Sequence, residues 1–532
     1  MTEITGFEKK NNTCNPTVDN VRDYVNDLNT FYCRFVYHDF STERNSVRDT
    51  LLSSDNHVSS VLEFDELCVS KALSSVNPNK GPGPDCVTPK VLKYCAEQLS
   101  FIFTHIFNMS IRTSCVPQSW KMSCIIPVPK KPVCNVMNDF RPVAMTSSVM
   151  KVFERLLLSV LQNKLTEFID PLQFAYRKNR SVEDAILFVL NSVYEHLEIP
   201  GSYVRMMFFD FSSAFNTIQP HLMANKLLNM NVDQNTILWI LDYLTNRPQF
   251  VKLSNHMSSI MTTNTGAPQG TVLSPFLFSV YTSDCVINAP SCPLVRYADD
   301  TSLSGLISNN DESSYRSAIT SFVNWCDQNY LLLNVSKTKE MVVDFRKGNK
   351  TEHQPVFIKG GTVEIVPEYK YLGVVFDENL SWSENTTNII KKSHPRMFFL
   401  RKLRSFNVHK DILHNFFQSI VHSVLTFGSL CWGGNVTAGD IHRIDRVIRK
   451  AEKLMGREEC YFSSFLEDRD RAKLARIKND ETYPLRQEFI SRELPSGRYR
   501  VPALRTERYR GTFVPRSILA FNGTFRRGAP IV

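Results

Sequence analysis

Two adjacent carboxylates in the second half of the chain are the residues best suited to chemistry. Asp299 and Asp300 stand between the apolar-leaning runs 294–297 and 301–303. The order apolar, turn, apolar predicts a β-hairpin with both acids at or beside its tip. Adjacent aspartates are also common as plain solvated turn residues, because Asp bonds well to turn backbone. A third carboxylate close in space would favour chemistry over a solvated turn.

An earlier segment supplies that third carboxylate. Asp210 ends the apolar run 204–209, which predicts a buried strand with an acid at its end. A buried, unpaired carboxylate is costly and needs a cation. The hairpin is suited to lie next to this strand in one sheet. Asp210, Asp299 and Asp300 would then form a hard-cation site of oxygen donors, most naturally for Mg²⁺.

Two cations and one amide could serve a nucleotide at such a site. Lys130 and Arg141 flank a loop-linked pair of extended segments. If they point the same way they would grip a triphosphate, and equally they could be ordinary surface charges. Gln269 stands in the Gly- and Pro-bearing loop 266–275, whose backbone can approach a planar ligand that the amide could hydrogen-bond.

Periodicity predicts the elements that position these residues. Apolar residues at helical spacing predict helices at 21–40, 91–113, 149–168, 185–193, 324–332, 386–428 and 436–457. Extended apolar runs predict strands at 120–131, 204–210, 341–345 and 369–376. Ser181 is a good N-cap for the helix that follows it.

Composition sets the broad class of protein. The 532 residues are 42% hydrophobic and 22% charged, with a net charge of +9, which permits a polyanionic partner without demanding one. Residues 498–527 hold eight arginines and one acid, and read either as a basic binding segment or as a solvated tail. Scattered cysteines, no signal peptide and no apolar run of about 20 residues predict a soluble, intracellular protein.

Several motifs in fixed order give the chain a family resemblance. They are Gly-Pro-Asp at 83–85, Pro-Val-Pro-Lys-Lys at 127–131, Phe-Arg-Pro-Val at 140–143, Gln-Phe-Ala-Tyr-Arg at 173–177, Phe-Asp-Phe-Ser-Ser-Ala-Phe at 209–215, Gly-Ala-Pro-Gln-Gly-Thr-Val-Leu-Ser-Pro at 266–275, Tyr-Ala-Asp-Asp at 297–300, Leu-Asn-Val-Ser-Lys-Thr-Lys at 333–339 and Tyr-Leu-Gly at 371–373. Any one would be weak, but their joint order and spacing are specific. The chain resembles the reverse transcriptases of non-LTR (LINE-type) retrotransposons.

The resemblance implies an α+β fold of the right-hand polymerase type, with fingers, a palm bearing an antiparallel sheet, and a helical thumb. The expected division begins with an N-terminal helical extension (1–70), followed by the fingers with the start of the palm (71–205). The reverse transcriptase domain spans 120–376, with its palm core at 204–376. A helical basic thumb (385–457) and a basic C-terminal segment (458–532) follow. The implied activity is RNA-directed DNA polymerase, a nucleotidyltransferase that extends a primer 3′-hydroxyl with dNTPs.

The resemblance also implies roles for single residues. Asp210, Asp299 and Asp300 would be catalytic and would hold two Mg²⁺ ions, with Mn²⁺ as a possible substitute. Phe215 would be a ring that excludes a 2′-hydroxyl, and Gln269 would contact the incoming nucleotide or the template. Lys130 and Arg141 would bind the triphosphate, and Lys337, with Lys339 as an equal neighbour, would donate a proton to pyrophosphate. Tyr371, Leu372 and Gly373 would form the primer grip.

Expected partners are an RNA template, a DNA primer or target and dNTPs, with no membrane; nothing indicates an oligomeric state. Open reading frames of this type usually carry an endonuclease before the polymerase, and residues 1–76 hold no constellation for one. Two other interpretations stay open, a non-catalytic nucleic-acid-binding relic of such an element and an RNA polymerase with the same palm. A chromosomal DNA substrate would place the protein in the nucleus, the cytoplasm or both.

Overall fold

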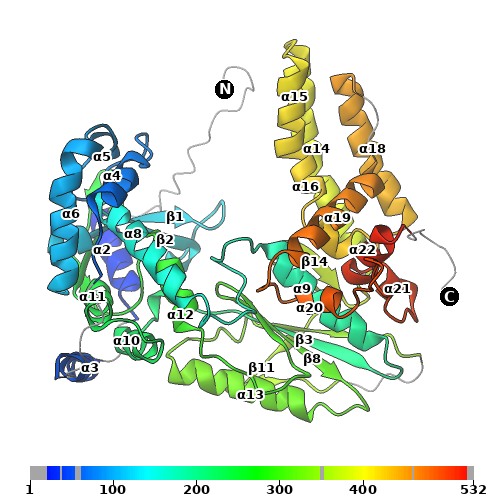
Figure 1. The fold of residues 1–532 in the computed structure, drawn as a ribbon, viewed down its shortest axis with the longest axis horizontal. Coiled ribbons are helices and arrows are strands. Elements are labelled where there is room, and N and C mark those ends of the chain that lie inside the picture. Colours follow the sequence, from blue (N-terminus) through cyan, green and yellow to red (C-terminus); the bar gives the residue numbers. More distant parts are fainter. Residues whose placement is uncertain (1–20, 36–38, 54–61, 348–352, 458–460, 524–532) are drawn as a thin grey trace.

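The structure is a computed structural model that describes residues 21–35, 39–53, 62–347, 353–457 and 461–523. Helices and strands are mixed irregularly along the chain, so the expected α+β class is confirmed. An N-terminal region with one sheet lies on the left in Figure 1, a second sheet lies at the bottom, and the C-terminal helices stand on the right. Parts of the expected N-terminal extension, residues 1–20, 36–38 and 54–61, lie outside the described residues.

The second sheet carries the predicted acids, and its strand order is β12-β9-β3-β8-β7. Its strands are β3 (Tyr203–Phe209), β7 (Leu294–Tyr297), β8 (Asp300–Ile307), β9 (Lys339–Val343) and β12 (Glu364–Ile365). All seven residues of β3 are buried, and alternate residues join two different core clusters. Helix α13 (Ser313–Gln328) packs into one cluster and α9 (Val182–Leu197) into the other. A strand covered on both faces must be apolar almost throughout, which explains the run that predicted it.

Three expectations about this region need correction. The sheet was expected to be antiparallel, and the pairings β3–β8, β3–β9 and β7–β8 are. However, β12 pairs with β9 in parallel. The segment between them, with β10 (Phe357–Ile358) and β11 (Gly361–Thr362), returns the chain to the end of the sheet where β9 starts. The helix expected at 324–332 starts earlier and ends at Gln328, because Tyr330 has a positive φ of 55°.

The strand expected at 369–376 is instead a tight hairpin of β13 (Glu368–Tyr371) and β14 (Val374–Asp377). Leu372 and Gly373 turn the chain with φ of 46° and 93°. Glycine adopts such angles readily, and its presence at this point is the sequence signal for the turn.

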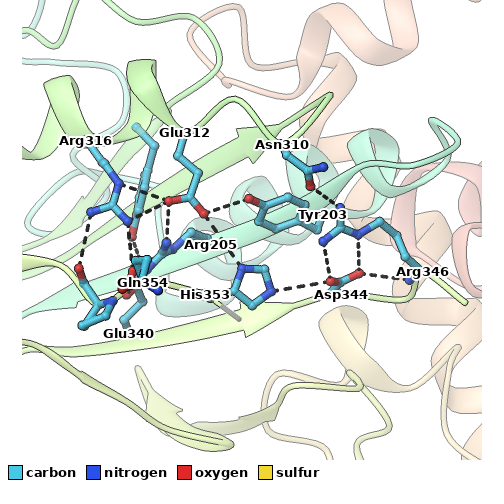
Figure 2. Close-up of polar contacts among 12 residues, drawn as sticks. Tyr203, Arg205, Asn310, Glu312, Arg316, Glu340, Asp344, Arg346, His353 and Gln354 are labelled. Atoms are coloured by element: carbon cyan, nitrogen blue, oxygen red, sulfur yellow. Dashed lines mark hydrogen bonds and ion pairs between the residues drawn. The ribbon is translucent and has the colours of Figure 1, made fainter. Parts of the chain in front are cut away.

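A buried charge network anchors the middle of the central strand (Figure 2). The Arg205 guanidinium is fully buried and donates to Glu340 (Nη2 to Oε2, 2.7 Å) and to Glu312 (Nη1 to Oε2, 2.6 Å). The Tyr315 hydroxyl donates to Glu340 Oε1 at 2.6 Å. Gly305 lies opposite Arg205, and a Cβ there would come within 2.3 Å of the Tyr315 ring. The network therefore joins β3, β8, β9 and α13 into one rigid unit.

The N-terminal region surrounds a sheet in which β1 pairs with β2 and β4, and β4 with β5 and β6. Its strands are β1 (Ser123–Pro129), β2 (Phe140–Met145), β4 (Arg247–Leu253), β5 (His256–Met257) and β6 (Met261–Thr263). Its helices and 3₁₀ turns are α2 (Val21–Tyr32), α3 (Ser41–Ser53), α4 (Glu66–Ser74), α5 (Pro89–Tyr94), α6 (Ala96–Arg112), α7 (Gln118–Lys121), η1 (Met137–Asp139), α8 (Ser148–Leu165), η2 (Ala214–Asn216), α10 (Pro220–Asn229), α11 (Gln234–Leu244) and α12 (Ser274–Tyr281). The helix expected at 21–40 is helical only to Tyr32 within the described residues, where its buried face packs on β1 and β4.

The C-terminal half is helical, as expected, and two long helices project from it (Figure 1). Its helices are α14 (Ser383–Ser405), α15 (Lys410–Phe416), the π-helical turn η3 (Phe417–His422), α16 (Ser423–Leu425), α17 (Ser429–Trp432), α18 (Ala438–Met455), α19 (Phe462–Lys478), α20 (Arg486–Ile490), α21 (Glu507–Arg510) and α22 (Phe513–Phe521). Across the described residues, no helix is both long enough and apolar enough to cross a bilayer.

The basic C-terminal segment is folded over residues 461–523, so a solvated tail is the wrong interpretation there. Helix α22 is buried along eight of its nine residues. Arg516 is 1% exposed and forms two hydrogen bonds to the Asp470 carboxylate, at 2.7 and 2.8 Å. Arg508 lies 3.6 Å from the ring centroid of Phe345. Some of these arginines therefore hold the C-terminus onto the rest of the chain, whereas Arg526 and Arg527 lie outside the described residues.

Candidate active site

Asp299 and Asp300 lie at the tip of the β7–β8 hairpin, as predicted. Tyr297 pairs with Asp300, which leaves Ala298 and Asp299 as a two-residue turn. Two-residue hairpin loops favour residues with positive φ, and Ala298 has a φ of 58°. The turn therefore projects Asp299 beyond the end of the sheet, while Asp300 is the first residue of β8.

The third acid is brought beside them by strand register. Phe209 pairs with Thr301, so Asp210 follows β3 at the end of the sheet where Asp300 begins β8. The backbone of Asp210 is held by the loop before β9, because its carbonyl accepts from the Asn334 N–H at 2.8 Å and its N–H donates to Thr338 Oγ1 at 3.3 Å. The predicted convergence of the three acids at one sheet end is therefore what the fold produces.

The electrostatics of the three acids are unfavourable in the metal-free protein. Burial raises the pKa of Asp210, against the opposing charge of Lys337. Burial also raises the pKa of Asp299, and the negative charge of Asp210 adds to the rise. Although Asp300 is exposed as a whole residue, the partial burial of its carboxyl group and repulsion from Asp299 and Asp210 raise its pKa to about 6. The nearby cations do not offset these effects, so the site favours an added positive charge.

The donor set suits a hard divalent cation, since carboxylate oxygens are the ligands that Mg²⁺ prefers. Among the described residues, however, no group of three His, Cys, Asp or Glu side chains is arranged to hold a metal ion, and this includes the three acids. Three mutually repelling carboxylates are expected to spread apart without a cation. Ligation by all three would require their side chains to turn inward.

Three of the predicted cations surround the acids. Val128 pairs with Arg141, so Lys130 and Arg141 lie at the end of the β1–β2 ladder where the loop 130–139 connects the two strands. Burial lowers the pKa of Lys130, and the positive charges of Lys337 and Arg141 lower it further. Lys337 and Lys130 act electrostatically on Asp210, and Arg141 acts on Asp299. These charges therefore lie at one site, although they come from distant parts of the sequence.

The structure separates Lys337 from its equal neighbour. Lys339 Nζ donates to the Ser336 carbonyl at 2.8 Å and forms a 2.7 Å ion pair with Glu364, which belongs to the edge strand β12. Lys337 is the one whose charge acts on Asp210.

The glycine-bearing loop lies against the segment that follows Asp210. Backbone hydrogen bonds join Ala267 to Phe215 (N to O, 2.8 Å) and Gly266 to Ile218 (N to O, 2.7 Å). A Cβ on Gly266 would lie 2.6 Å from the Asn216 backbone, so this approach requires glycine. The Gln269 side-chain amide donates to Asn216 Oδ1 at 3.2 Å, and the Gln269 backbone carbonyl accepts from the Ala144 N–H at 2.7 Å. The loop thus connects the segment after β3 to β2.

Comparison of the sequence with known proteins matches the segment that carries this site to a family. Residues 128–376, which contain all three acids and the cations around them, match the family described as "Reverse transcriptase (RNA-dependent DNA polymerase)". The chain is 25% identical over 396 residues to a "Probable RNA-directed DNA polymerase from transposon BS" of Drosophila melanogaster, covering 71% of this chain and 43% of that protein. Residues 128–376 are a LINE-type reverse transcriptase domain.

Further relatives agree. The chain is 26% identical to the "RNA-directed DNA polymerase from mobile element jockey" of Drosophila melanogaster, over 69% of this chain and 41% of that protein. It is 25% identical to the "Probable RNA-directed DNA polymerase from transposon X-element" of the same organism, over 74% of this chain and 44% of that protein. The chain therefore spans less than half the length of these curated relatives.

Two other similarities are weaker. Residues 382–423, within the helices after the reverse transcriptase domain, match the family described as "Alkylated DNA repair protein alkB homolog 8, N-terminal". A solved structure of apo telomerase from Candida tropicalis, truncated from its C-terminal domain, is 13% identical with a TM-score of 0.35. The match covers 52% of this chain and 59% of that chain.

The predicted primer-grip residues of the reverse transcriptase domain lie in different environments. Tyr371 is 3% exposed, and its hydroxyl accepts a 3.0 Å hydrogen bond from Ser302 of β8. It therefore ties the β13–β14 hairpin to the sheet that carries the acids. Leu372 and Gly373 form the turn, with Leu372 half-buried and Gly373 exposed. In this geometry the turn, and not Tyr371, is available to a ligand.

Two tyrosines that are not among the predicted site residues lie near the acids of the reverse transcriptase domain. Burial raises the pKa of Tyr369, and the charges of Asp300 and Asp210 add to the rise. The same holds for Tyr176, which is acted on by Asp299 and Asp300 and has an unusual φ of 60°. Tyr176 belongs to the motif at 173–177, where an aromatic residue precedes a cation. A positive φ on an aromatic residue has no sequence signal, and so its placement could not be predicted.

Proposed function

We propose that this chain is the RNA-directed DNA polymerase of a LINE-type retroelement, which extends a primer 3′-hydroxyl with dNTPs. The observation that carries the proposal is the set of three carboxylates at one sheet end, Asp210, Asp299 and Asp300, with raised pKa values and flanking cations. Such a site attracts divalent cations and polyphosphate together. The reverse transcriptase domain and the relatives' names support the same reaction.

In this proposal the chain is a right hand. The sheet β12-β9-β3-β8-β7 is the palm within 204–376, the region 71–205 supplies the fingers and the start of the palm, and 385–457 is the thumb. Residues 1–70 are an N-terminal extension. The C-terminal segment 458–532 buttresses the thumb through the hydrogen bond from Arg516 to the Leu430 carbonyl, and the palm through Arg508 on the Phe345 ring. The thumb's projecting helices in Figure 1 fit this assignment.

Asp210, Asp299 and Asp300 would hold two Mg²⁺ ions, for which Mn²⁺ can substitute. Bound there, the ions would lower the barrier to attack by the primer hydroxyl and neutralise charge on the departing pyrophosphate. Lys130 and Arg141 would bind the triphosphate from the opposite side of the site and orient it for in-line attack. Lys337, next to Asp210, would donate a proton to the pyrophosphate oxygen as it leaves.

Phe215 and Gln269 would select and position the nucleotide. The Phe215 ring is half-buried and stacks on Phe278, with centroids 4.7 Å apart and planes at 28°. A ring held in this way offers a fixed wall against a 2′-hydroxyl. Gln269, held by Asn216 beside it, would contact the incoming nucleotide or the template.

The proposed nucleic-acid partners, an RNA template and a DNA primer or target, would also contact the thumb. A groove of about 500 Å³ lies between α14 and α18. It is lined by Ile390, His394, Met397, Arg401, Arg443, Arg446, Val447, Lys450 and Leu454. Cations around an apolar floor suit a phosphate backbone with its sugars.

Primer extension on poly(rA)·oligo(dT) with Mg²⁺ tests the proposal. The wild-type chain should incorporate dTTP, and Asp299→Asn should reduce the rate by about a thousandfold or more, because it removes a charged metal ligand. Binding of the template–primer should be unchanged in that variant. Asp327→Asn is the control, since Asp327 is an exposed acid paired with Lys359. Full activity of Asp299→Asn would refute the assignment, and an inactive wild-type chain that binds RNA would instead support the relic interpretation.

A further inference from the structure

The segment just before α9 lies along the free edge of the catalytic hairpin. The Arg296 N–H in β7 donates to the Leu172 carbonyl at 2.9 Å, and the Phe174 N–H donates back to the Arg296 carbonyl at 2.9 Å. The Arg296 guanidinium also pairs with Asp170 at 2.5 Å. Residues 170–174 therefore act as one more strand and carry the side chain between Leu172 and Phe174, that of Gln173, to the tip of the hairpin.

The Gln173 side chain is an amide that forms its hydrogen bonds with nearby backbone groups. Gln173 is 1% exposed. Its Nε2 donates to the Ala298 carbonyl at 3.2 Å, and its Oε1 accepts from the Ala298 N–H at 3.0 Å. Oε1 also accepts from the Ala175 N–H at 3.1 Å. The amide thus satisfies both backbone groups of one turn residue, as a paired strand would.

The residue that it holds is the strained one. Ala298 has a φ of 58°, a left-handed conformation that alanine, unlike glycine, adopts only at a cost in free energy. Asp299 follows directly, so the direction of its carboxylate depends on that φ. Strained backbone persists where its surroundings fix it, and such sites are commonly functional. Here the two hydrogen bonds between the Gln173 amide and the Ala298 backbone fix the left-handed conformation.

We infer that Gln173 is a positioning residue for the reaction, which acts through Ala298 to fix the backbone from which the Asp299 and Asp300 side chains would ligate metal. The inference rests on the proposed polymerase function. It adds a residue that touches neither substrate nor metal and comes from the segment before α9, 125 residues from Ala298 in the sequence. The Gln173 amide holds both backbone groups of Ala298, so the turn has an external support that fixes where Asp299 leaves the sheet.

A purely structural role is the competing explanation, and the chain contains a matched control for it. Asn108 of α6 makes the same pair of hydrogen bonds to Phe64, whose N–H donates to Oδ1 at 2.8 Å and whose carbonyl accepts from Nδ2 at 2.9 Å. Phe64 belongs to the N-terminal region and not to the acids' sheet. Gln173→Met and Asn108→Leu each replace a side-chain amide by an apolar group of similar size and remove two hydrogen bonds to one residue. Gln173→Met also removes the bond from the Ala175 N–H.

The first readout is Mn²⁺ binding by the full chain, followed by the electron paramagnetic resonance of free Mn²⁺. Gln173→Met should weaken binding by about tenfold or more, as is typical when a group that orients metal ligands is lost. Asn108→Leu should bind Mn²⁺ as the wild type does, even if its melting temperature falls as far. Equal Mn²⁺ affinity in Gln173→Met and the wild type would overturn the inference.

The second readout is primer extension. Gln173→Met should lower kcat by about tenfold or more while the KM for dTTP changes by about twofold or less, because the triphosphate contacts are intact. Ala298→Gly introduced into Gln173→Met should restore part of both kcat and Mn²⁺ affinity, since glycine adopts the turn conformation without strain. No recovery, or a loss confined to KM, would contradict the mechanism.

The experiments distinguish a failure of the positioning role of Gln173 from a failure of the proposed polymerase function. If the wild type extends primers and Gln173→Met does so equally, the positioning role is wrong and the polymerase function stands. If the wild type does not extend primers, the function is wrong, and the Mn²⁺ titrations still decide whether Gln173 supports the acids. Should Gln173→Met fail to fold, Gln173→Asn serves instead: its side chain is one methylene shorter, so the amide no longer reaches both Ala298 groups from position 173. Unchanged Mn²⁺ affinity in that variant would also overturn the inference.

Discussion

Asp210 and Asp300 sit side by side at one end of the central sheet because Phe209 pairs with Thr301 in the ladder between β3 and β8. Neither strand positions an acid pair by itself. The register does, and a shift of one residue would turn one of the two carboxylates to the opposite face. The closeness is unfavourable without a cation, and repulsion from Asp299 and Asp210, together with burial, raises the pKa of Asp300 to about 6.

This pKa predicts a stability cost that metal relieves. Between pH of about 4 and about 6 the folded state keeps a proton that the unfolded state has released, so stability falls as pH rises through this window. Above pH 6 without divalent metal, Asp300→Asn should therefore raise the melting temperature. Mg²⁺ should stabilise the wild type and have little effect on the variant. Thermal melts in EDTA and in Mg²⁺ check this, and a lower melting temperature for Asp300→Asn in EDTA would contradict it.

The two lysines of the loop before β9 should differ in function. Lys337→Met should lower kcat by about 10²-fold or more, since it removes the proposed proton donor. Lys339→Met is the matched control and should change little, because Lys339 is held by Glu364 at the sheet edge. Single-turnover extension over a pH range measures both. A larger loss in Lys339→Met would reverse the assignment.

Phe215 should determine the choice of sugar. Phe215→Val removes the ring while keeping an apolar side chain over Phe278, and should raise kcat/KM for ribonucleotides relative to deoxynucleotides by about tenfold or more. Phe211→Val is the control, since Phe211 lies near the same turn but its ring contacts Phe322, with centroids 6.3 Å apart. Competition between rUTP and dTTP measures the ratio. An RNA polymerase with the same palm predicts no change in Phe215→Val.

The groove between α14 and α18 should bind phosphates. Replacing the exposed cations Arg446 and Lys450 with Gln should weaken template–primer binding about equally for all sequences. It should also reduce the slope of log K against log salt by about one for each phosphate that the variant no longer neutralises. Lys359→Gln is the control, because Lys359 pairs with Asp327 on another face. Fluorescence anisotropy at several salt concentrations measures the slope, and an unchanged slope would exclude the groove from the nucleic-acid path.

The buried network of Figure 2 should matter for stability more than any exposed pair. Arg205→Met leaves Glu340 buried without its cation, and should cost about 3–5 kcal/mol in free energy of unfolding. Arg316 is the i,i+4 partner of Glu312, and the Arg316 side chain is 39% exposed. Arg316→Met should therefore cost about 1 kcal/mol or less in free energy of unfolding. Urea titrations compare them. The prediction fails if the two variants unfold at the same midpoint.

Much of the site was predictable because its signals are local. The apolar run before Asp210 marks a strand buried on both faces, and the hairpin around Asp299 follows from apolar runs on either side of a turn. Gly266 marks a loop whose backbone can approach closely. The linked motifs then indicated the family, which the match over 128–376 confirms.

Other features depend on which segments meet, and a linear pattern carries no record of that. The parallel pairing of β12, the turn at Leu372 and the folded C-terminal segment were each mispredicted or left open. Lys337 and Lys339 were equivalent in sequence, and only the ion pair to Glu364 distinguishes them.

The sequence by itself determined the chemistry of this protein: which carboxylates, cations and rings are available, and which strands and turns carry them, because these depend on residue type and short-range spacing. The tertiary structure decided their geometry. Sheet register put Asp210 beside Asp300, and the edge segment placed Gln173 on Ala298, because long-range backbone pairing and packing set these distances. A residue such as Gln173 becomes functional only through a contact made across the fold.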